Sequence, residues 1–225
     1  MRQYLVIPFV LLVFLTTASA QDTASESYLT WSASHAESIA KEMRESSKIG
    51  RLFDLRGIHT SRSVNYKFRA TWLTPEVIRA AARLEQLKNR LSDKQTRELV
   101  AEAEAAGETV FMVEIDPREG SGVIPEEWRA ILQPKDLRVG AEGAVSGVKS
   151  PMFRNIKALA GTTRRDYDWD VFWVTFPLVD KDKNPVFPVG VSQIELIIGI
   201  YNSEGRLSWP MPESIRTRIK SLSKK

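Results

Sequence analysis

The sequence predicts an α+β fold, with an antiparallel β-sheet or sandwich as its core and a long helix or helix pair inserted between the first two strands. Two observations support this class. Residues 172–178 and 194–200 are β-branched and aromatic runs that flank a short polar segment, the pattern of a long antiparallel hairpin. Residues 75–106 instead repeat apolar side chains three and four positions apart, as one face of a helix does. Strands and helices are therefore segregated, which favours antiparallel pairing over a doubly wound parallel sheet.

The predicted hairpin is expected to lie at the centre of the fold. Alternate residues of a strand share one face, so each run presents a continuous apolar face. The inward-facing positions would be Phe172, Val174, Phe176, Leu178, Ile194, Leu196, Ile198 and Ile200. The opposite faces also carry apolar residues, including Trp173 and Ile197, so we expect both sides of these strands to be covered.

Residues 1–20 have the pattern of a secretory signal peptide. Arg2 gives a positive start, residues 4–15 are nearly all apolar, and an Ala-x-Ala cleavage site ends at Ala20. The apolar run is shorter than the roughly 20 residues that a membrane-spanning helix needs. We therefore expect cleavage near Ala20, export to the periplasm or the medium, and no transmembrane segment in the mature chain.

Composition and charge exclude several classes of protein. The chain of 225 residues has no cysteine, which excludes disulfides, thiolate chemistry and a lipid-anchored lipoprotein. Removal of residues 1–20 takes Arg2 with it, so the net charge falls from +4 to +3. That charge is too small for the electrostatic footprint of a nucleic-acid-binding protein, and we expect no nucleic-acid partner.

Residues 21–61 are expected to form an N-terminal extension with one helix. Ser34 is a candidate N-cap, Ile39 and Met43 give a thin apolar stripe over residues 35–47, and Gly50 would end the helix.

The β-rich globular domain is expected over residues 62–212. Residues 63–72 alternate apolar and polar side chains, which predicts a strand with one face in the core and one in water. A second strand is predicted over residues 108–116, a short helix carrying Trp128 over 125–132, and a short strand ending at Trp209.

The helical insertion has clear start signals. Thr74 followed by Pro75 is an N-cap with proline at the first helical position. Ser92 and Gln95 form a capping box, which is a second possible helix start. Residues 75–106 should therefore be one kinked helix or two helices.

Residues 213–225 are expected to be a basic C-terminal tail. Ile215, Ile219 and Leu222 would lie on one helical face among lysines and arginines. Such a tail would either touch an anionic membrane, cell-wall polymer or partner, or form a short frayed helix.

The candidate ligand-binding residues are Asp166, Asp168, Asp170, Trp169 and Trp128. On a strand the three aspartates would share a face at about 6–7 Å per step, a separation at which two carboxylates can flank a sugar bond. Tryptophans near the ends of elements can stack on a sugar ring. The alternative without a binding role is that the aspartates are solvated and neutralised by the preceding arginines, and that the tryptophans are core residues.

Motifs for metals, cofactors and catalysis are missing. His35 and His59 are the two histidines of the chain, and they lack the spacing of metal ligands. Residues 180–184 begin like a calcium loop, but Pro185 and Val191 occupy the positions that require glycine and glutamate. We therefore expect no catalytic residue, metal or cofactor.

These observations favour an exported, non-catalytic binding or interaction module that uses the loops around residues 166–169 and 120–132. Two alternatives stay open: a carboxylate-dependent glycan hydrolase that uses the aspartate cluster, and a structural or assembly protein of the cell envelope. The candidate partners are a glycan, another envelope component or a protein.

Overall fold

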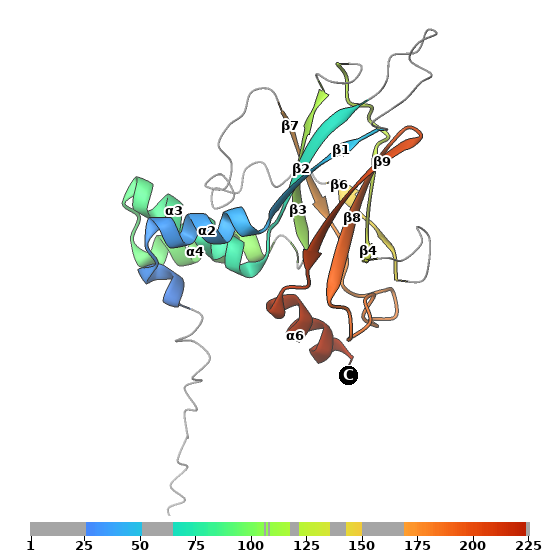
Figure 1. Cartoon of the computed structure of the whole chain (residues 1–225). Helices are drawn as coiled ribbons and strands as arrows, with labels where there is room; N and C mark the ends of the chain where they lie inside the picture. Colours follow the sequence, from blue (N-terminus) through green and yellow to red (C-terminus); the bar gives the residue numbers. More distant parts are fainter. Residues whose placement is uncertain are drawn as a thin grey trace, which may run out of the picture.

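The computed structural model of the chain describes residues 26–50, 65–105, 107, 109–117, 122–135, 143–149 and 169–223. These residues form an α+β structure in which helices accompany two antiparallel sheets (Figure 1). The predicted fold class is therefore confirmed. The predicted signal peptide, residues 1–20, lies outside the described residues.

The strands of the described residues are divided between a five-stranded and a four-stranded sheet. Sheet A has the order β1-β2-β3-β7-β6 and sheet B the order β5-β4-β8-β9. Sheet A consists of β1 (Arg44–Ile49), β2 (Tyr66–Trp72), β3 (Val110–Asp116), β7 (Asp170–Thr175) and β6 (Val148–Lys149). Sheet B consists of β5 (Val145–Ser146), β4 (Arg129–Pro134), β8 (Gln193–Ile200) and β9 (Ser203–Pro210).

The predicted central hairpin is wrong, because β7 and β8 belong to different sheets. β7 pairs with β3 and β6, whereas β8 pairs with β4 and β9. Pro177, Pro185 and Pro188 lie in the segment between the two strands and lack the N–H groups that a continuous ladder needs. The polar segment closes only a small local turn, in which Asp180 Oδ1 accepts hydrogen bonds from the backbone N–H groups of residues 182 and 184 at 2.9 and 2.8 Å.

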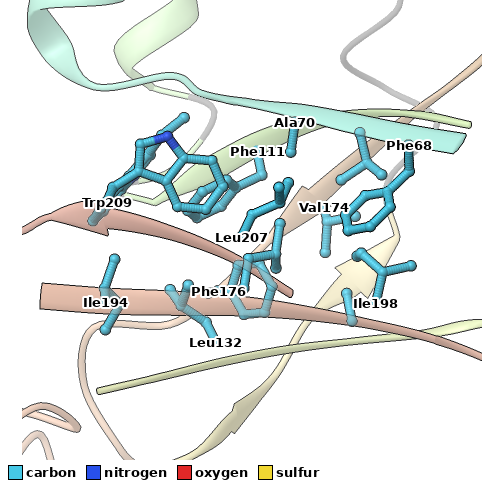
Figure 2. Packing of buried hydrophobic residues seen from close by; sticks show 14 of the residues in the cluster. Phe68, Ala70, Phe111, Leu132, Val174, Phe176, Ile194, Ile198, Leu207 and Trp209 are labelled. Atoms are coloured by element: carbon cyan, nitrogen blue, oxygen red, sulfur yellow. The ribbon is translucent and has the colours of Figure 1, made fainter. Parts of the chain in front are cut away.

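The predicted inward faces of these two strands are nevertheless right. Val174 and Phe176 on one side, and Ile194 and Ile198 on the other, belong to one buried cluster. Their side chains point toward one another from opposite sheets rather than lying side by side in one sheet (Figure 2). An alternating apolar pattern identifies the buried face of a strand, but does not say which sheet the strand joins.

The two sheets also meet along both lateral edges. On one side the chain passes from β5 to β6 through Gly147, where a Cβ atom would lie 2.4 Å from Val174 Cγ1. On the other side β1 and β9 run next to each other, and Trp209 Nε1 donates a hydrogen bond to the Met43 carbonyl oxygen at 3.2 Å (Figure 1). The core thus lies between the two sheets.

A group of helices forms an arm beside the outer face of sheet A (Figure 1). The arm consists of η1 (Ser27–Thr30), α2 (Ala33–Glu42), α3 (Pro75–Asn89) and α4 (Asp93–Glu104). The insertion is a pair of helices, since Arg90 adopts a left-handed conformation (φ 53°) at the end of α3. Ser92 and Gln95 then form the predicted capping box of α4. Trp173 of β7 packs against the arm, so both faces of this strand are covered as predicted.

Two of the predicted helices differ from the structure. The helix expected over residues 35–47 ends at Glu42, because the carbonyl of Met43 accepts a hydrogen bond from Trp72 N–H at 3.0 Å and β1 begins. Residues 125–128 are a turn that leads into β4, and not a short helix.

The C-terminal segment forms α6 (Glu213–Leu222). Ile215 and Ile219 are buried in the same core as the two sheets, and Leu222 packs against it. The apolar face of this helix therefore packs inside the molecule, and the helix is not frayed. Contact of its basic side chains with an anionic membrane, a cell-wall polymer or a partner stays a prediction. In the described part of the chain, no helix is long and apolar enough to cross a membrane.

A substitution at Gly205 tests the close approach of β9 and β1. A Cβ atom at this position would lie 2.4 Å from Phe68 Cε1 and 2.6 Å from the Lys48 carbonyl oxygen. We expect Gly205→Ala to lower the free energy of unfolding by about 2 kcal/mol, as overpacking of a core does.

The matched control is Gly190→Ala, because a Cβ atom at Gly190 meets nothing within 4 Å. Its effect on the free energy of unfolding should stay within about 0.5 kcal/mol. Urea unfolding measures both variants, and equal stabilities would contradict the close approach of β9 to β1.

Candidate functional site

Several strands begin or end at the end of the sheets that lies opposite α6. β3 and β8 end there, and β4, β7 and β9 begin there, as their antiparallel registers require. β9 runs from this end to α6 (Figure 1). The described part of the predicted site and the turn between β8 and β9 therefore share one end of the molecule.

Only part of the predicted aspartate cluster can be placed. Asp166 and Asp168 lie outside the described residues. Asp170 is the first residue of β7, stands opposite Ile115 in the register and is exposed. Trp169 is half-buried, and the guanidinium carbon of Arg69 lies 4.2 Å from the centroid of its ring.

Trp128 is part of the core in this structure. Its side chain is 3% exposed, and its ring centroid lies 5.0 Å from that of Phe172 in an edge-on arrangement. Lys149 Nζ lies 4.8 Å from the centroid of the same ring. These contacts leave little of the indole ring accessible for stacking on a sugar.

Next to Trp169 is a charged cluster that the sequence analysis missed. Glu114 of β3 has a side chain that is 2% exposed, on the face of sheet A that points away from the core. Its Oε1 accepts a hydrogen bond from Arg69 Nη2 at 2.6 Å, and its Oε2 accepts one from Arg44 Nη2 at 2.9 Å. A glutamate inside an otherwise apolar strand was the available signal, because a buried carboxylate needs a charged or hydrogen-bonding partner.

This cluster ties three strands together. Arg44 lies on β1, Arg69 on β2 and Glu114 on β3, so the two ion pairs link the edge strand β1 to the centre of the sheet. Both carboxylate oxygens are occupied by guanidinium groups, which makes Glu114 unsuited to act as a base or nucleophile. The cluster therefore positions strands rather than performing chemistry.

A groove of about 360 Å³ lies at the same end of the molecule, over sheet B. It is lined by Pro125, Glu126, Glu127, Arg129, Gly199 and Tyr201. Its volume falls within the range of about 300–1,000 Å³ that small-molecule sites occupy. The groove includes part of the predicted contact loop 120–132, while Gly199 and Tyr201 were not anticipated.

Gly199 makes room for this groove. It lies within β8 and pairs with Arg129 on one side and Glu204 on the other. The Arg129 side chain crosses the space above it, since a Cβ atom at Gly199 would lie 2.7 Å from Arg129 Nε. Glycine within a strand often marks a place where another group approaches the backbone closely, and here that group is Arg129.

Tyr201 forms one side of the groove and has an unusual backbone. It occupies the two-residue turn between Ile200 and Ser203, has a φ of 52° and is 67% exposed. A left-handed conformation costs a residue with a Cβ atom about 1–2 kcal/mol, and glycine or asparagine is usual there. Arg90 and Lys183 also have a positive φ, so Tyr201 is distinguished by its exposed ring beside the groove.

Charged side chains continue along the outer face of sheet B beside the groove. Arg206 donates to Glu204 Oε1 at 2.6 Å and to Glu195 Oε2 at 2.8 Å. The hydrogen bond to Glu204 raises the pKa of Arg206, and the charges of the nearby carboxylates raise it further. Partial desolvation lowers this pKa, but by less. Its guanidinium group therefore stays protonated and holds both glutamates in place.

Within the described residues, no group of three or more histidine, aspartate or glutamate side chains could hold a metal ion. No protein-family model, curated protein or solved structure matches the chain.

Glu114 provides a test of the charged cluster. Glu114→Gln should lower the free energy of unfolding by about 3 kcal/mol, because it removes the charge that compensates two arginines on a largely buried face. The control is Glu213→Gln, which alters an exposed pair with Arg216 and should cost about 0.5 kcal/mol or less. Chemical unfolding measures both, and a Glu114→Gln effect no larger than that of the control would contradict the assigned role.

Proposed function

We propose that this protein is an exported, non-catalytic carbohydrate-binding module, and that the groove beside Tyr201 is its binding site. The observation that carries the proposal is the exposed Tyr201 ring, held in a strained turn next to a groove of ligand size. The proposal moves the binding site from the predicted aspartates to the opposite sheet, at the same end of the molecule.

The groove offers the groups that sugars require. The C–H face of a sugar packs against an aromatic ring, and Tyr201 presents such a ring with its hydroxyl group as a polar tip. Glu126 and Glu127 are exposed and supply acceptors for sugar hydroxyl groups, while Arg129 supplies donors. A small number of polar groups around an apolar contact is the usual composition of a ligand site.

The positions of the carboxylates in the groove support binding without hydrolysis. A glycoside hydrolase usually holds one carboxyl group in an apolar pocket, so that it stays protonated and acts as the acid. Glu126 and Glu127 are adjacent in the chain and both are exposed, so neither has that environment. The hydrolase alternative uses the cluster of Asp166, Asp168 and Asp170, of which Asp170 is exposed at the start of β7 and the other two lie outside the described residues.

Export is the second part of the proposal and rests on the pattern of residues 1–20. An exported module would meet the polysaccharides of the cell envelope, which is consistent with a carbohydrate ligand. The mild positive charge of the mature chain would also tolerate anionic polymers nearby.

Replacement of Tyr201 separates binding from stability. Tyr201→Asn should weaken binding of the oligosaccharide best retained on a glycan array by at least about tenfold, since the stacking surface is lost. The free energy of unfolding should not fall, because asparagine adopts the left-handed conformation more readily than tyrosine. Titration calorimetry and urea unfolding measure the two effects.

The control is Val189→Asn, which changes an exposed apolar residue outside the groove and should leave binding unchanged. If the array retains no oligosaccharide, or if Tyr201→Asn binds as the native chain does, the groove is not a carbohydrate site.

The export proposal has its own test. Expression of the full chain in a bacterium with a periplasm should yield a soluble envelope fraction whose mass corresponds to a chain that begins at Gln21. Intact-mass spectrometry of the periplasmic and cytoplasmic fractions measures this, with Ala20→Leu as the variant that should block processing. Full-length protein in the cytoplasm, from both the native and variant genes, would contradict export.

A further inference from the structure

The groove beside Tyr201 is lined by charged groups of both signs. Glu126 and Glu127 lie in the turn before β4, and Arg129 is the first residue of that strand. All three residues are exposed, so a ligand in the groove would replace the water around two carboxylates and one guanidinium group. The charge pattern of the groove therefore restricts the chemical class of its ligand.

None of these three charges is paired inside the molecule. In the part of the chain that the structure describes, the side chains of Glu126, Glu127 and Arg129 have no hydrogen-bond or ion-pair partner. By contrast, Arg206 and Glu204 on the same sheet are joined at 2.6 Å. The groove thus presents one guanidinium group and two carboxylates that are available to a ligand.

Arg129 is held against the backbone of β8. Its Nε, Cγ and Cδ atoms lie 2.7, 2.9 and 3.4 Å from the position that a Cβ atom of Gly199 would take. The guanidinium group has therefore lost part of its rotational freedom before a ligand binds, which lowers the entropic cost of binding. A planar guanidinium group of this kind is suited to bind a carboxylate through two parallel hydrogen bonds.

The net charge of the groove is close to zero. Its lining has a sum of −1 (two anions and one cation). Lys149 brings this sum to zero, because its Nζ donates a hydrogen bond to the Glu126 carbonyl oxygen and adds a cation nearby. The neighbouring Arg206 is already bound to Glu204 and Glu195. A ligand with a single charge of either sign would thus meet opposing charges, whereas a ligand with both charges would find a partner for each.

The opposite charges of the groove lie close together in the chain. Glu127 and Arg129 are separated by one residue, so their Cα atoms are at most about 7 Å apart. A single sugar unit that carries two charged substituents can therefore contact both side chains.

From these observations we infer that the ligand of the groove is a zwitterionic saccharide, with an ammonium and a carboxylate group on one sugar unit. The carboxylate would bind the guanidinium group of Arg129, and the ammonium group would bind at the turn that carries Glu126 and Glu127. The sugar ring between them would pack against Tyr201. This inference rests on the proposed carbohydrate site and names the class of its ligand.

The test uses four monosaccharides that separate the two charges on one ring. Muramic acid carries both an ammonium and a carboxylate group, N-acetylmuramic acid only the carboxylate, glucosamine only the ammonium group, and N-acetylglucosamine neither. Muramic acid should bind the mature chain at least about tenfold more tightly than each of the others, because it alone forms both charge-assisted contacts. Titrations of the 15N-labelled chain at about pH 6, where both groups are ionised, measure the four affinities by two-dimensional NMR.

Substitutions assign each charge of the sugar to its partner. Arg129→Gln should remove the preference for muramic acid over glucosamine. A double variant, Glu126→Gln with Glu127→Gln, should remove its preference over N-acetylmuramic acid. The matched controls are Lys135→Gln and Glu45→Gln, which change exposed residues outside the groove and should leave all four affinities unchanged.

The outcomes distinguish this inference from the proposed function. Equal binding of the four sugars, or a preference for a sugar with a single charge, would overturn the zwitterionic ligand but leave the carbohydrate site. An unchanged preference in the Arg129→Gln variant would also overturn it. If muramic acid does not bind, the inference is wrong, whereas the proposed function fails only if the glycan array also retains no oligosaccharide.

Discussion

The packing of Trp209 against Trp72 and Phe111 joins the two sheets, and it fixes the strand that begins next to Tyr201. The ring centroid of Trp209 lies 5.3 Å from that of Phe111 and 6.3 Å from that of Trp72. Trp209 belongs to β9, while the other two rings come from adjacent strands of sheet A. Such aromatic contacts add to the large apolar area that these side chains bury. β9 is thereby fixed against the opposite sheet, and it connects the turn that carries Tyr201 to α6.

Features that depend on neighbouring residues in the sequence were predictable. The alternation of β2, the N-cap at Thr74 and the capping box at Ser92 are local patterns with local physical causes, and the structure has each of them. The pairing of β7 and β8 was not predictable in this way. Their apolar faces are buried equally well whether the strands lie side by side in one sheet or opposite each other across a core. Only the complete set of strands distinguishes the two arrangements.

The candidate site was predicted less well than the fold. Trp128 was chosen because it stands next to an element boundary, but packing against Phe172 makes it a core residue. Tyr201 was not among the predicted residues, because a positive φ cannot be recognised from a tyrosine in the sequence. The predicted contact loop 120–132 includes Pro125, Glu126, Glu127 and Arg129, which line the groove together with residues distant in the chain.

The most direct test of the central claim is a titration of the 15N-labelled mature chain with an oligosaccharide, followed by two-dimensional NMR. If β9 and the surrounding strands place the binding site as described, the largest chemical-shift changes will fall on the backbone amides of residues 126–129 and 199–202. Changes centred on the start of β7 or on the helical arm, with these amides unaffected, would contradict the assignment of the groove.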